Sequence, residues 1–344
     1  MQVNSFSRVM NERKSNIELL RIIAIIMIVV FHCNYYSLGV PGKEEIISSP
    51  LLSFWRVFAE QICVVGVNVF VLISGWFGIK PSLKGLCSLL FQVFFWGAII
   101  LLIGLVLHLD IPVKSSLMVF WFGGYYWFVI AYIGLYVLSP MLNAFIEKAS
   151  PKQFLTVLIC FFTVEFIYGW FIDSDSFSGG YSIISFVGLY LLARYIRLHS
   201  AYLKTTKPVL DILVYFLMTL IPAIVSFVGI KNSWKQFFPL HYTSPFVITA
   251  AVSLLLFFSK FEFKNKFVNW IGCSTFCAYL IHQHPIIDPY FKSTMQHLAE
   301  AFPPASYSCI AVLLSALIVL ASATLDKVRI KCWGKISAGW TELR

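Results

Sequence analysis

The sequence predicts an all-α, polytopic membrane protein: one helix bundle over residues 1–344 with about ten transmembrane spans and both termini in the cytoplasm. Three observations support this fold class, namely an apolar composition, a series of apolar runs of helical length, and an uneven distribution of basic residues. Hydrophobic residues make up 59% of the 344 and charged residues only 12%, against about 45–50% and 25% in soluble domains. So few charges cannot cover a water-facing surface, which excludes a soluble two-domain enzyme. The 33 Phe, 16 Tyr and 10 Trp likewise exclude a disordered chain.

The apolar runs have the length that a membrane requires, about 20 mostly apolar residues per helix. The ten candidate spans are Ile17–Tyr36, Val57–Ile79, Leu86–Leu107, Tyr125–Leu142, Gln153–Ile172, Tyr181–Ile196, Val209–Ile230, Pro245–Ser259, Phe267–Ile286 and Ala305–Leu325. The sixth and eighth are short, and the ninth contains Gly272. The first follows basic residues as a signal peptide does, but it is too long and no small-x-small cleavage site follows Phe31, so we expect an uncleaved span.

The basic residues indicate the orientation. With the N-terminus inside, this topology places 20 of the 26 lysines and arginines on the cytoplasmic side and 6 outside. The outer six are Lys43, Arg56, Lys114, Lys231, Lys235 and Lys292. Cytoplasmic loops of membrane proteins carry such an excess. The same bias accounts for the net charge of +10 without a nucleic-acid partner.

The first span carries the ionisable groups that best suit a functional site, because charges inside a bilayer cost roughly 2.5–3.5 kcal/mol each on insertion. Arg21 and His32 are eleven residues apart, which is about 1100° of helical rotation and about 16 Å of rise, so both lie on one stripe. Glu18 precedes Arg21 by one turn and can pair with it. Arg21 would sit near the cytoplasm and His32 near the outer face. The alternative for Arg21 is a snorkelling anchor.

A second histidine reaches a similar depth. His282 ends the ninth candidate span about 15 residues from its start, as His32 does in the first. Each alone fits an interfacial histidine satisfied by water, but the shared depth favours a common site. Neither has the His-Glu-x-x-His spacing of a metal site. The eight cysteines contain no Cys-x-x-Cys, so they indicate membrane-buried thiols and no metal or disulfide framework.

Four short motifs occur in order along the chain. They are Asn16–Ala24 followed by Phe31-His32, then Phe70–Phe77 with its Ser74-Gly75, then Trp127-Phe128 with Leu138-Ser139-Pro140, and finally Tyr279–His282. Together they resemble the acyltransferase-3 family of integral membrane acyltransferases: its basic residue, ten residues, then His; its Phe…Ser-Gly-aromatic motif; its Trp-Phe and Leu-Ser-Pro span; and its late Tyr-Leu-x-His. Ten spans is also the usual count of that family.

One departure from the family concerns the first cytoplasmic loop. Many members carry an arginine pair after the Ser-Gly motif, whereas this chain has Lys80 and Lys84. Lysine binds a phosphate as a point charge but lacks the bidentate fork of arginine.

The resemblance implies an O-acyltransferase that takes an acyl group, commonly acetyl, from cytoplasmic acyl-CoA and places it on a hydroxyl of an extracytoplasmic glycan. Acyl-CoA would be a co-substrate, with no permanently bound cofactor. In this scheme Lys80 and Lys84 hold the donor, and Arg21 either holds the donor or orients the catalytic site. His32 acts as general base or as a transient acyl carrier, and His282 either supports the catalytic residue or lies on the acceptor side. The expected partners are acyl-CoA, the glycan and membrane lipid, in a multi-pass protein of the cell membrane.

The remaining candidates surround the outer end of the bundle. Tyr126 and Trp127 begin the fourth span and fit an aromatic belt better than a sugar-stacking platform; with Glu60 and Tyr279 they are the candidates for acceptor binding. Ser74-Gly75 is expected to allow close helix packing. The buried Glu165 is expected to bond between helices.

Two other functional classes use the same features. A transporter or flippase for a lipid-linked glycan or small solute would use the polar stripe as a pathway, although no internal repeat is visible. A glycan polymerase or ligase would need larger outer loops than this chain has.

Overall fold

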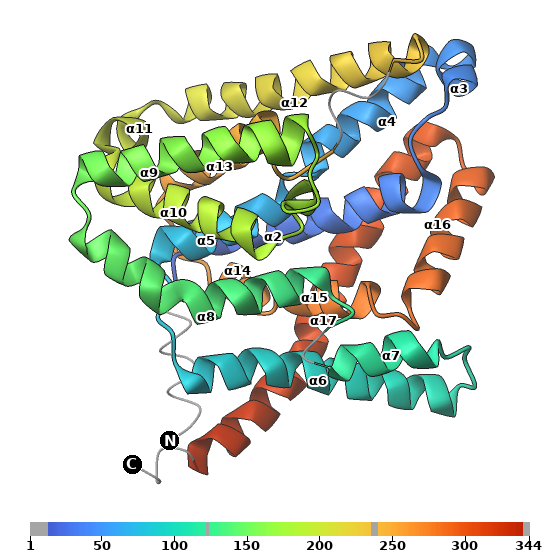
Figure 1. Cartoon of the computed structure of the whole chain (residues 1–344). Coiled ribbons are helices and arrows are strands. Elements are labelled where there is room, and N and C mark those ends of the chain that lie inside the picture. The colour runs from blue at the N-terminus through green and yellow to red at the C-terminus, as the bar shows by residue number, and fades with distance from the viewer. Residues whose placement is uncertain (1–12, 122–123, 235–239, 340–344) are drawn as a thin grey trace.

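The computed structural model describes residues 13–121, 124–234 and 240–339, and the regular secondary structure of this part of the chain is entirely helical, without strands. The main helices form one bundle, in which most run roughly parallel or antiparallel (Figure 1). They are α2 (Ser15–Phe31), α4 (Pro50–Cys63), α5 (Gly66–Phe77), α6 (Leu83–Val106), α8 (Trp127–Lys148), α9 (Pro151–Val164), α10 (Ile183–His199), α12 (Pro208–Lys231), α13 (Pro245–Ser259), α14 (Lys266–Gly272), α15 (Thr275–His282) and α17 (Pro304–Ala338). Shorter helices connect them: α3 (Lys43–Ser48), α7 (Val113–Phe120), α11 (Ala201–Thr205) and α16 (Asp288–Ala301).

All ten candidate spans fall on helices, and seven helical segments are long and apolar enough to cross a membrane within the described residues. The segments are Ser15–Tyr36, Pro50–Phe77, Leu83–Val106, Trp127–Lys148, Pro151–Phe171, Pro208–Lys231 and Pro304–Ala338. The eighth candidate is confirmed as the shorter apolar helix α13. The fold is therefore that of a polytopic helical membrane protein.

The ninth candidate span is wrong as one continuous helix, because the chain breaks at Cys273 and Ser274 into α14 and α15. Gly272 ends α14 at a close contact with α2. A Cβ atom on Gly272 would lie 2.5 Å from Oε2 of Glu18. The break therefore lies at a contact with the first span, which apolar patterning alone does not reveal.

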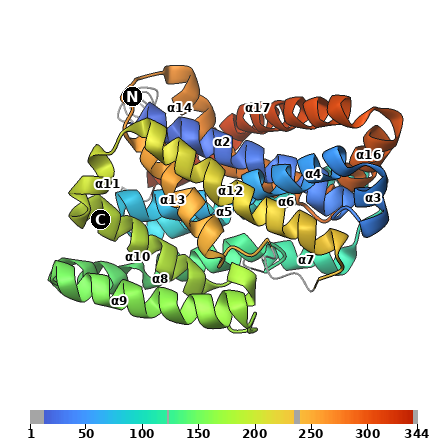
Figure 2. The same cartoon turned by 90° about the horizontal axis from the view of Figure 1, so that it is seen from above.

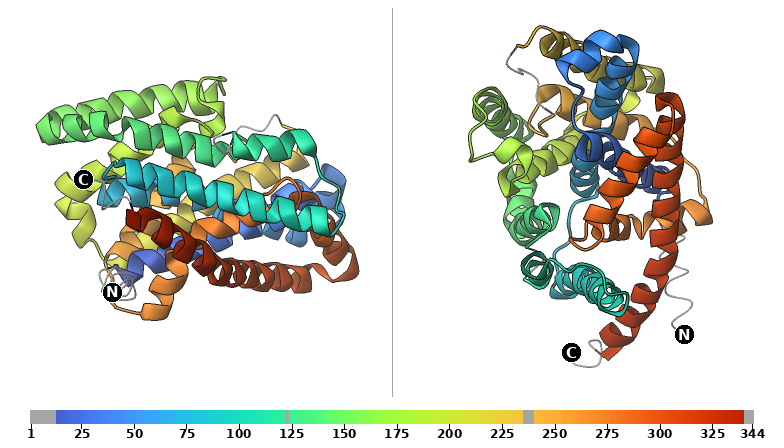
Figure 3. Two further views of the ribbon diagram at one scale, coloured as in Figure 1. Left: turned by 90° about the horizontal axis from the view of Figure 1, so that it is seen from below. Right: turned by 90° about the vertical axis from the view of Figure 1, so that its right-hand side faces the viewer.

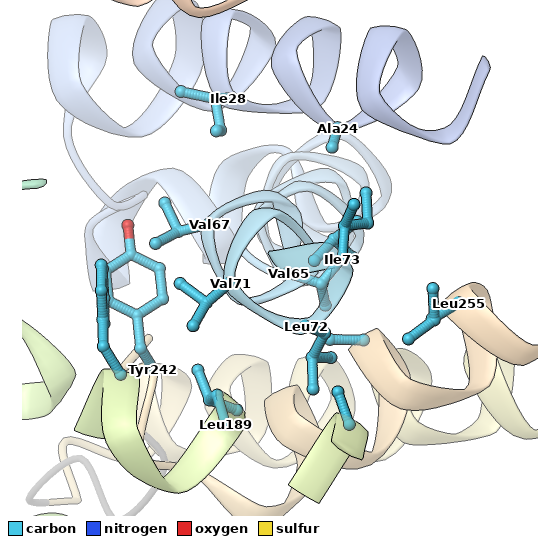
Figure 4. Packing of buried hydrophobic residues seen from close by; sticks show 14 of the residues in the cluster. Ala24, Ile28, Val65, Val67, Val71, Leu72, Ile73, Leu189, Tyr242 and Leu255 are labelled. Atoms are coloured by element: carbon cyan, nitrogen blue, oxygen red, sulfur yellow. The ribbon is translucent and has the colours of Figure 1, made fainter. Parts of the chain in front are cut away.

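Helix α5 lies at the centre of the core, between α2, α10 and α13 (Figure 4). Its Val71 and Leu72 are fully buried. Two glycines let its neighbours approach: a Cβ on Gly66 would lie 2.7 Å from the carbonyl oxygen of Ala24, and one on Gly75 would lie 2.5 Å from that of Tyr190. The expected packing role of the Ser-Gly motif is confirmed for Gly75.

Contacts at the two ends of the bundle agree with the expected topology. Nζ of Lys84, in the first turn of α6, donates to the carbonyl oxygen of Ser337 near the end of α17 (3.4 Å). On the other side, Nζ of Lys43 donates to Oγ of Ser233 (3.1 Å), which joins two outer loops. The start of α2 and the end of α17 lie toward the same end of the bundle (Figure 1). Three of the charges counted above, Arg8, Lys235 and Arg344, lie outside the described residues.

The periphery has the character of a lipid-facing surface. Seen from above, α9 lies along one edge of the bundle and α17 along the other, with α5 between them (Figure 2). In the view along the bundle, α17 crosses the other helices obliquely (Figure 3, right). Large apolar side chains such as Leu102, Leu217 and Leu317 point outward and are at least half exposed. In water such a surface would aggregate, whereas in a bilayer it is solvated.

Candidate active site

His32 lies where the first span changes its helical geometry. Helix α2 ends at Phe31, and a π-helical turn, His32–Tyr36, continues it. Such turns widen the helix locally and are frequent at functional sites. The hydroxyl of Ser37 donates to the carbonyl oxygen of His32 (2.7 Å), which ties this turn to the residue that follows it. The imidazole is thus held on a short, specialised segment at the outer end of the span.

The structure brings His282 into direct contact with His32. Nδ1 of His32 lies 2.8 Å from Nε2 of His282, and the ring centroids are 5.0 Å apart. The expected shared depth of the two histidines is therefore confirmed. His282 is 2% exposed and ends α15, so a buried side chain packs against His32.

The hydrogen-bond chain fixes the tautomers of both rings. Nδ1 of His282 lies 2.6 Å from the carbonyl oxygen of Ala278, which only accepts, so this nitrogen carries the proton. In the neutral ring Nε2 of His282 is then an acceptor, and Nδ1 of His32 donates to it. Nε2 of His32 is left unprotonated and without a hydrogen-bond partner in the described part of the chain. A lone pair in this state is what a general base or a nucleophile needs.

A cavity of about 330 Å³ adjoins His32, here called the outer cavity. Aromatic side chains make up most of its wall. They are Phe31, Tyr35, Tyr36, Phe70, Tyr125, Tyr126, Trp127, Phe128, Tyr181, Tyr242, Phe276 and Tyr279. Its volume lies at the lower end of the ~300–1,000 Å³ typical of ligand sites. Tyrosines present both an apolar face and a hydroxyl group, so the wall suits an amphipathic ligand.

A second cavity of about 260 Å³, the inner cavity, contains Arg21. The expected pair is present: Nη1 of Arg21 donates to Oε1 of Glu18 (2.9 Å). Nη1 of Arg13 donates to the same oxygen (3.0 Å). Two guanidinium groups thus share one buried carboxylate, which leaves an excess positive charge and free N–H donors at this cavity. Such a site favours an anion.

One stripe of α2 serves both cavities. Arg21 lines the inner cavity, while Ile25, Ile28 and His32 line the outer one. Their spacing of three to four residues is that of a single helix face. The expectation that Arg21 and His32 share a stripe is confirmed.

The structure does not bring Lys80 and Lys84 to the inner cavity. Lys80 lines a separate cavity of about 150 Å³ together with Glu147 and Arg194. Lys84 is bonded to the end of α17, as described above. Both lie at the same end of the bundle as Arg21, but Arg13 takes the place beside it.

The four acceptor candidates lie around the outer cavity or next to it. Tyr126, Trp127 and Tyr279 line the cavity itself, and the hydroxyl of Tyr126 donates to the carbonyl oxygen of Leu280 (2.8 Å). Trp127 packs on Tyr181 with a centroid distance of 4.3 Å. Trp127 therefore lies in a cavity wall and contacts other rings of the protein.

Glu60 lies in a third cavity, of about 200 Å³, which shares Phe31, Tyr35 and Tyr181 with the outer cavity. Nδ2 of Asn34 donates to Oε1 of Glu60 (3.1 Å). The carboxyl group is thus adjacent to the outer cavity and does not contact His32.

Sequence reasoning missed Arg13 and most of the aromatic wall. Arg13 precedes the apolar run, so it read as one of several topological charges. Arg13 lies before α2, which begins at Ser15, so helical spacing could not have placed it beside Arg21. Tyr35 and Tyr36 follow His32 directly, but their placement depends on the π-helical turn.

Other buried acids have structural partners or lie apart from both cavities. Asp211 forms an ion pair with Lys260 on the inner side. Glu165 is buried at the junction of α9 and a π-helical turn. In the described part of the chain, no three His, Cys, Asp or Glu side chains gather in an arrangement that suits a metal ion.

Comparison with known proteins identifies one family. A family model described as an acyltransferase domain, that of acyltransferase 3, matches residues 14–325, which is most of the chain. No curated protein and no solved structure matches the chain.

Proposed function

The chain belongs to the acyltransferase-3 family of membrane O-acyltransferases, and from that premise we propose that it moves an acetyl group from cytoplasmic acetyl-CoA to a hydroxyl of an extracytoplasmic glycan. Family membership decides in favour of an enzyme against the transporter and polymerase alternatives. The protein is a multi-pass membrane protein with several apolar spans. The donor, the acceptor and the residue roles are the parts that the proposal adds.

The observation that carries the proposal is the chain from His32 through His282 to Ala278. The unprotonated Nε2 of His32 supports the assignment of this residue as the base. The acceptor hydroxyl gives its proton to this nitrogen while its oxygen attacks the thioester carbonyl. The C–O bond forms, the C–S bond breaks, and the proton passes from His32 to the departing sulfur, so that the ester and free CoA thiol result. Meanwhile Nδ1–H of His32 keeps its bond to His282, which stabilises the imidazolium.

The inner cavity supports the donor side. The excess positive charge of Arg13 and Arg21 over Glu18 suits the phosphates of CoA. Arg21 and His32 are about 16 Å apart along the helix axis at the standard rise of 1.5 Å per residue, so an extended pantetheine arm can bridge them. Lys80 and Lys84, at the same end, are candidates for the more distant phosphate groups.

The aromatic wall of the outer cavity supports a sugar acceptor. Trp127 and Tyr279 offer flat apolar faces, and the tyrosine hydroxyls offer hydrogen bonds. Glu60, in the adjoining cavity, is placed to accept hydrogen bonds from a further part of the same acceptor. This arrangement suits a carbohydrate better than an acyl chain, which has no polar groups to satisfy.

The direct test uses membrane vesicles from cells that express the protein, which carry the endogenous acceptor. Radiolabelled acetyl-CoA is added, and both the free CoA thiol and the label retained by the vesicle material are measured. His32→Ala should lose both signals. The matched control is His297→Ala, because His297 lies on α16 with its side chain 79% exposed and lines none of the cavities described above. Equal transfer by wild type and His32→Ala contradicts the catalytic role of His32. If wild type transfers no label, the assignment of acetyl-CoA as the donor is wrong.

A further inference from the structure

The inner and outer cavities meet at three phenylalanines. Phe70, Phe128 and Phe276 are the residues that line both cavities. They come from three helices that are distant in sequence, namely α5, α8 and α15. All three side chains are half-buried, as expected for rings that face open space on two sides. They form a partition between the cavity of Arg21 and the cavity of His32.

The partition is apolar, and two of its three rings pack together. The rings of Phe128 and Phe276 lie 6.1 Å apart, and both contact Tyr279, at 5.9 and 6.0 Å. Phe128 also stacks on Tyr132, at 5.9 Å. A phenyl ring makes no hydrogen bond that would fix its orientation, so the barrier to its rotation is set by packing alone.

The partition stands in the path of the acyl group. If the donor's phosphates bind at Arg21 and the acceptor is activated at His32, as in the function proposed above on which this inference rests, the thioester must enter between the three rings. We infer that Phe70, Phe128 and Phe276 form a hydrophobic gate that limits the size of the acyl group and so selects short-chain acyl-CoA. The closed gate also separates the two aqueous cavities when no donor is present.

The physical basis of the selection is the volume between the rings. An acetyl group adds one methyl to the carbonyl, whereas each further methylene must displace a ring or find a void in a packed wall. A pocket discriminates by about tenfold or more per misplaced methylene. Replacing one phenyl group by a methyl opens space at the point where the chain passes.

The first test is a chain-length series. Vesicles with wild type, Phe70→Ala, Phe128→Ala or Phe276→Ala are given acetyl-, butyryl- or hexanoyl-CoA at the cytoplasmic face, and acyl transfer is measured. Wild type should prefer acetyl, and at least one variant should raise the hexanoyl-to-acetyl ratio by about tenfold or more. The matched control is Phe162→Ala, because Phe162 on α9 is equally half-buried but lines neither cavity; its ratio should equal that of wild type. Wild-type ratios in all three variants overturn the gate.

The second test needs no enzyme activity. Val67 lines the outer cavity one turn from Phe70, and Val67→Cys is made in a background whose native cysteines are replaced by serine. A membrane-impermeant thiol reagent is applied from the cytoplasmic face. Labelling should be slow with the intact gate and clearly faster with Phe128→Ala or Phe276→Ala, because each change removes part of the packed barrier. Equal labelling rates overturn the gate. If wild type transfers no acyl group in the first test but the labelling rates still differ, the proposed function is contradicted and the gate is not.

Discussion

Nδ1 of His32 and Nε2 of His282 lie 2.8 Å apart although 250 residues separate them in the chain. The contact joins the outer end of the first span to the end of α15 and orients one imidazole by the other. A neighbouring backbone carbonyl holds the second ring in turn. As in other catalytic histidines, a hydrogen-bond partner on one ring nitrogen determines whether the other nitrogen carries a proton.

His32→Ala should reduce acyl transfer by about 10²–10⁴-fold, the usual contribution of a general base. Membrane insertion should not suffer, because alanine makes the span more apolar. Expression and membrane content are measured beside activity. A variant that transfers acyl groups at the wild-type rate contradicts the role of His32.

His282→Gln should retain more activity than His282→Ala. The glutamine side-chain oxygen can accept from Nδ1 of His32, as Nε2 of His282 does, whereas alanine leaves that N–H unpaired. An unpaired buried donor costs about 1–3 kcal/mol, so we expect a loss of roughly 5–150-fold in rate for alanine and a partial recovery for glutamine. If the two variants are equally impaired, His282 does not act by orienting His32.

Arg21→Lys should impair transfer less than Arg21→Ala without restoring it fully. Lysine keeps the charge near Glu18 but loses the planar fork that binds phosphate with two parallel bonds. The expected change is mainly in KM for acetyl-CoA, which steady-state kinetics in vesicles can measure. Equal kinetics in Arg21→Lys, Arg21→Ala and wild type would reduce Arg21 to an anchor at the inner boundary.

Gly75→Ala should destabilise the protein by about 1–3 kcal/mol, as overpacking of a dense core does. The added Cβ would lie 2.5 Å from the backbone carbonyl oxygen of Tyr190, and a backbone atom cannot move aside as a side chain can. The control is Gly334→Ala, where nothing lies within 4 Å of the added atom and the helix should gain slightly. Thermal unfolding in detergent compares them, and an unchanged Tm for Gly75→Ala argues against the close α5–α10 contact.

Much of the fold follows from local properties of the sequence. The apolar run Pro245–Ser259 is an α-helix with those same bounds, because a bilayer rewards any apolar segment that satisfies its own backbone. The break after Gly272 does not follow in this way. It lies where Glu18 packs against the glycine, and this contact is tertiary.

The candidate site likewise combines features that local sequence predicts with features that depend on tertiary contacts. The stripe of Arg21 and His32 follows from helical periodicity, and the pair Glu18–Arg21 from a spacing of one turn. The loop position of Lys80 suggested that it binds the donor beside Arg21. In the structure Arg13 occupies that place, because Arg13 and Arg21 donate to the same carboxylate oxygen of Glu18. Likewise Phe70, Phe128 and Phe276 meet only through the packing of three helices, so no local pattern identifies them as a set.

The sidedness of the chain can be checked independently of activity. Ser82 precedes α6 and Ser293 lies on α16, on opposite sides of the expected topology. An impermeant thiol reagent should label Ser82→Cys only from the cytoplasm and Ser293→Cys only from outside. Labelling with the reverse sidedness would invert the topology and with it the positions of both cavities.

The most direct measurement of the central claim is acyl transfer across a sealed membrane. Radiolabelled acetyl-CoA is supplied to one face of vesicles of known orientation, and the label is then located by enzymatic or chemical release from each face. Acetyl-CoA at the cytoplasmic face should yield label on material that is accessible only from the opposite face, and His32→Ala should yield none. Transfer supported by acetyl-CoA at the outer face alone, or label that remains on the cytoplasmic side, would contradict the account.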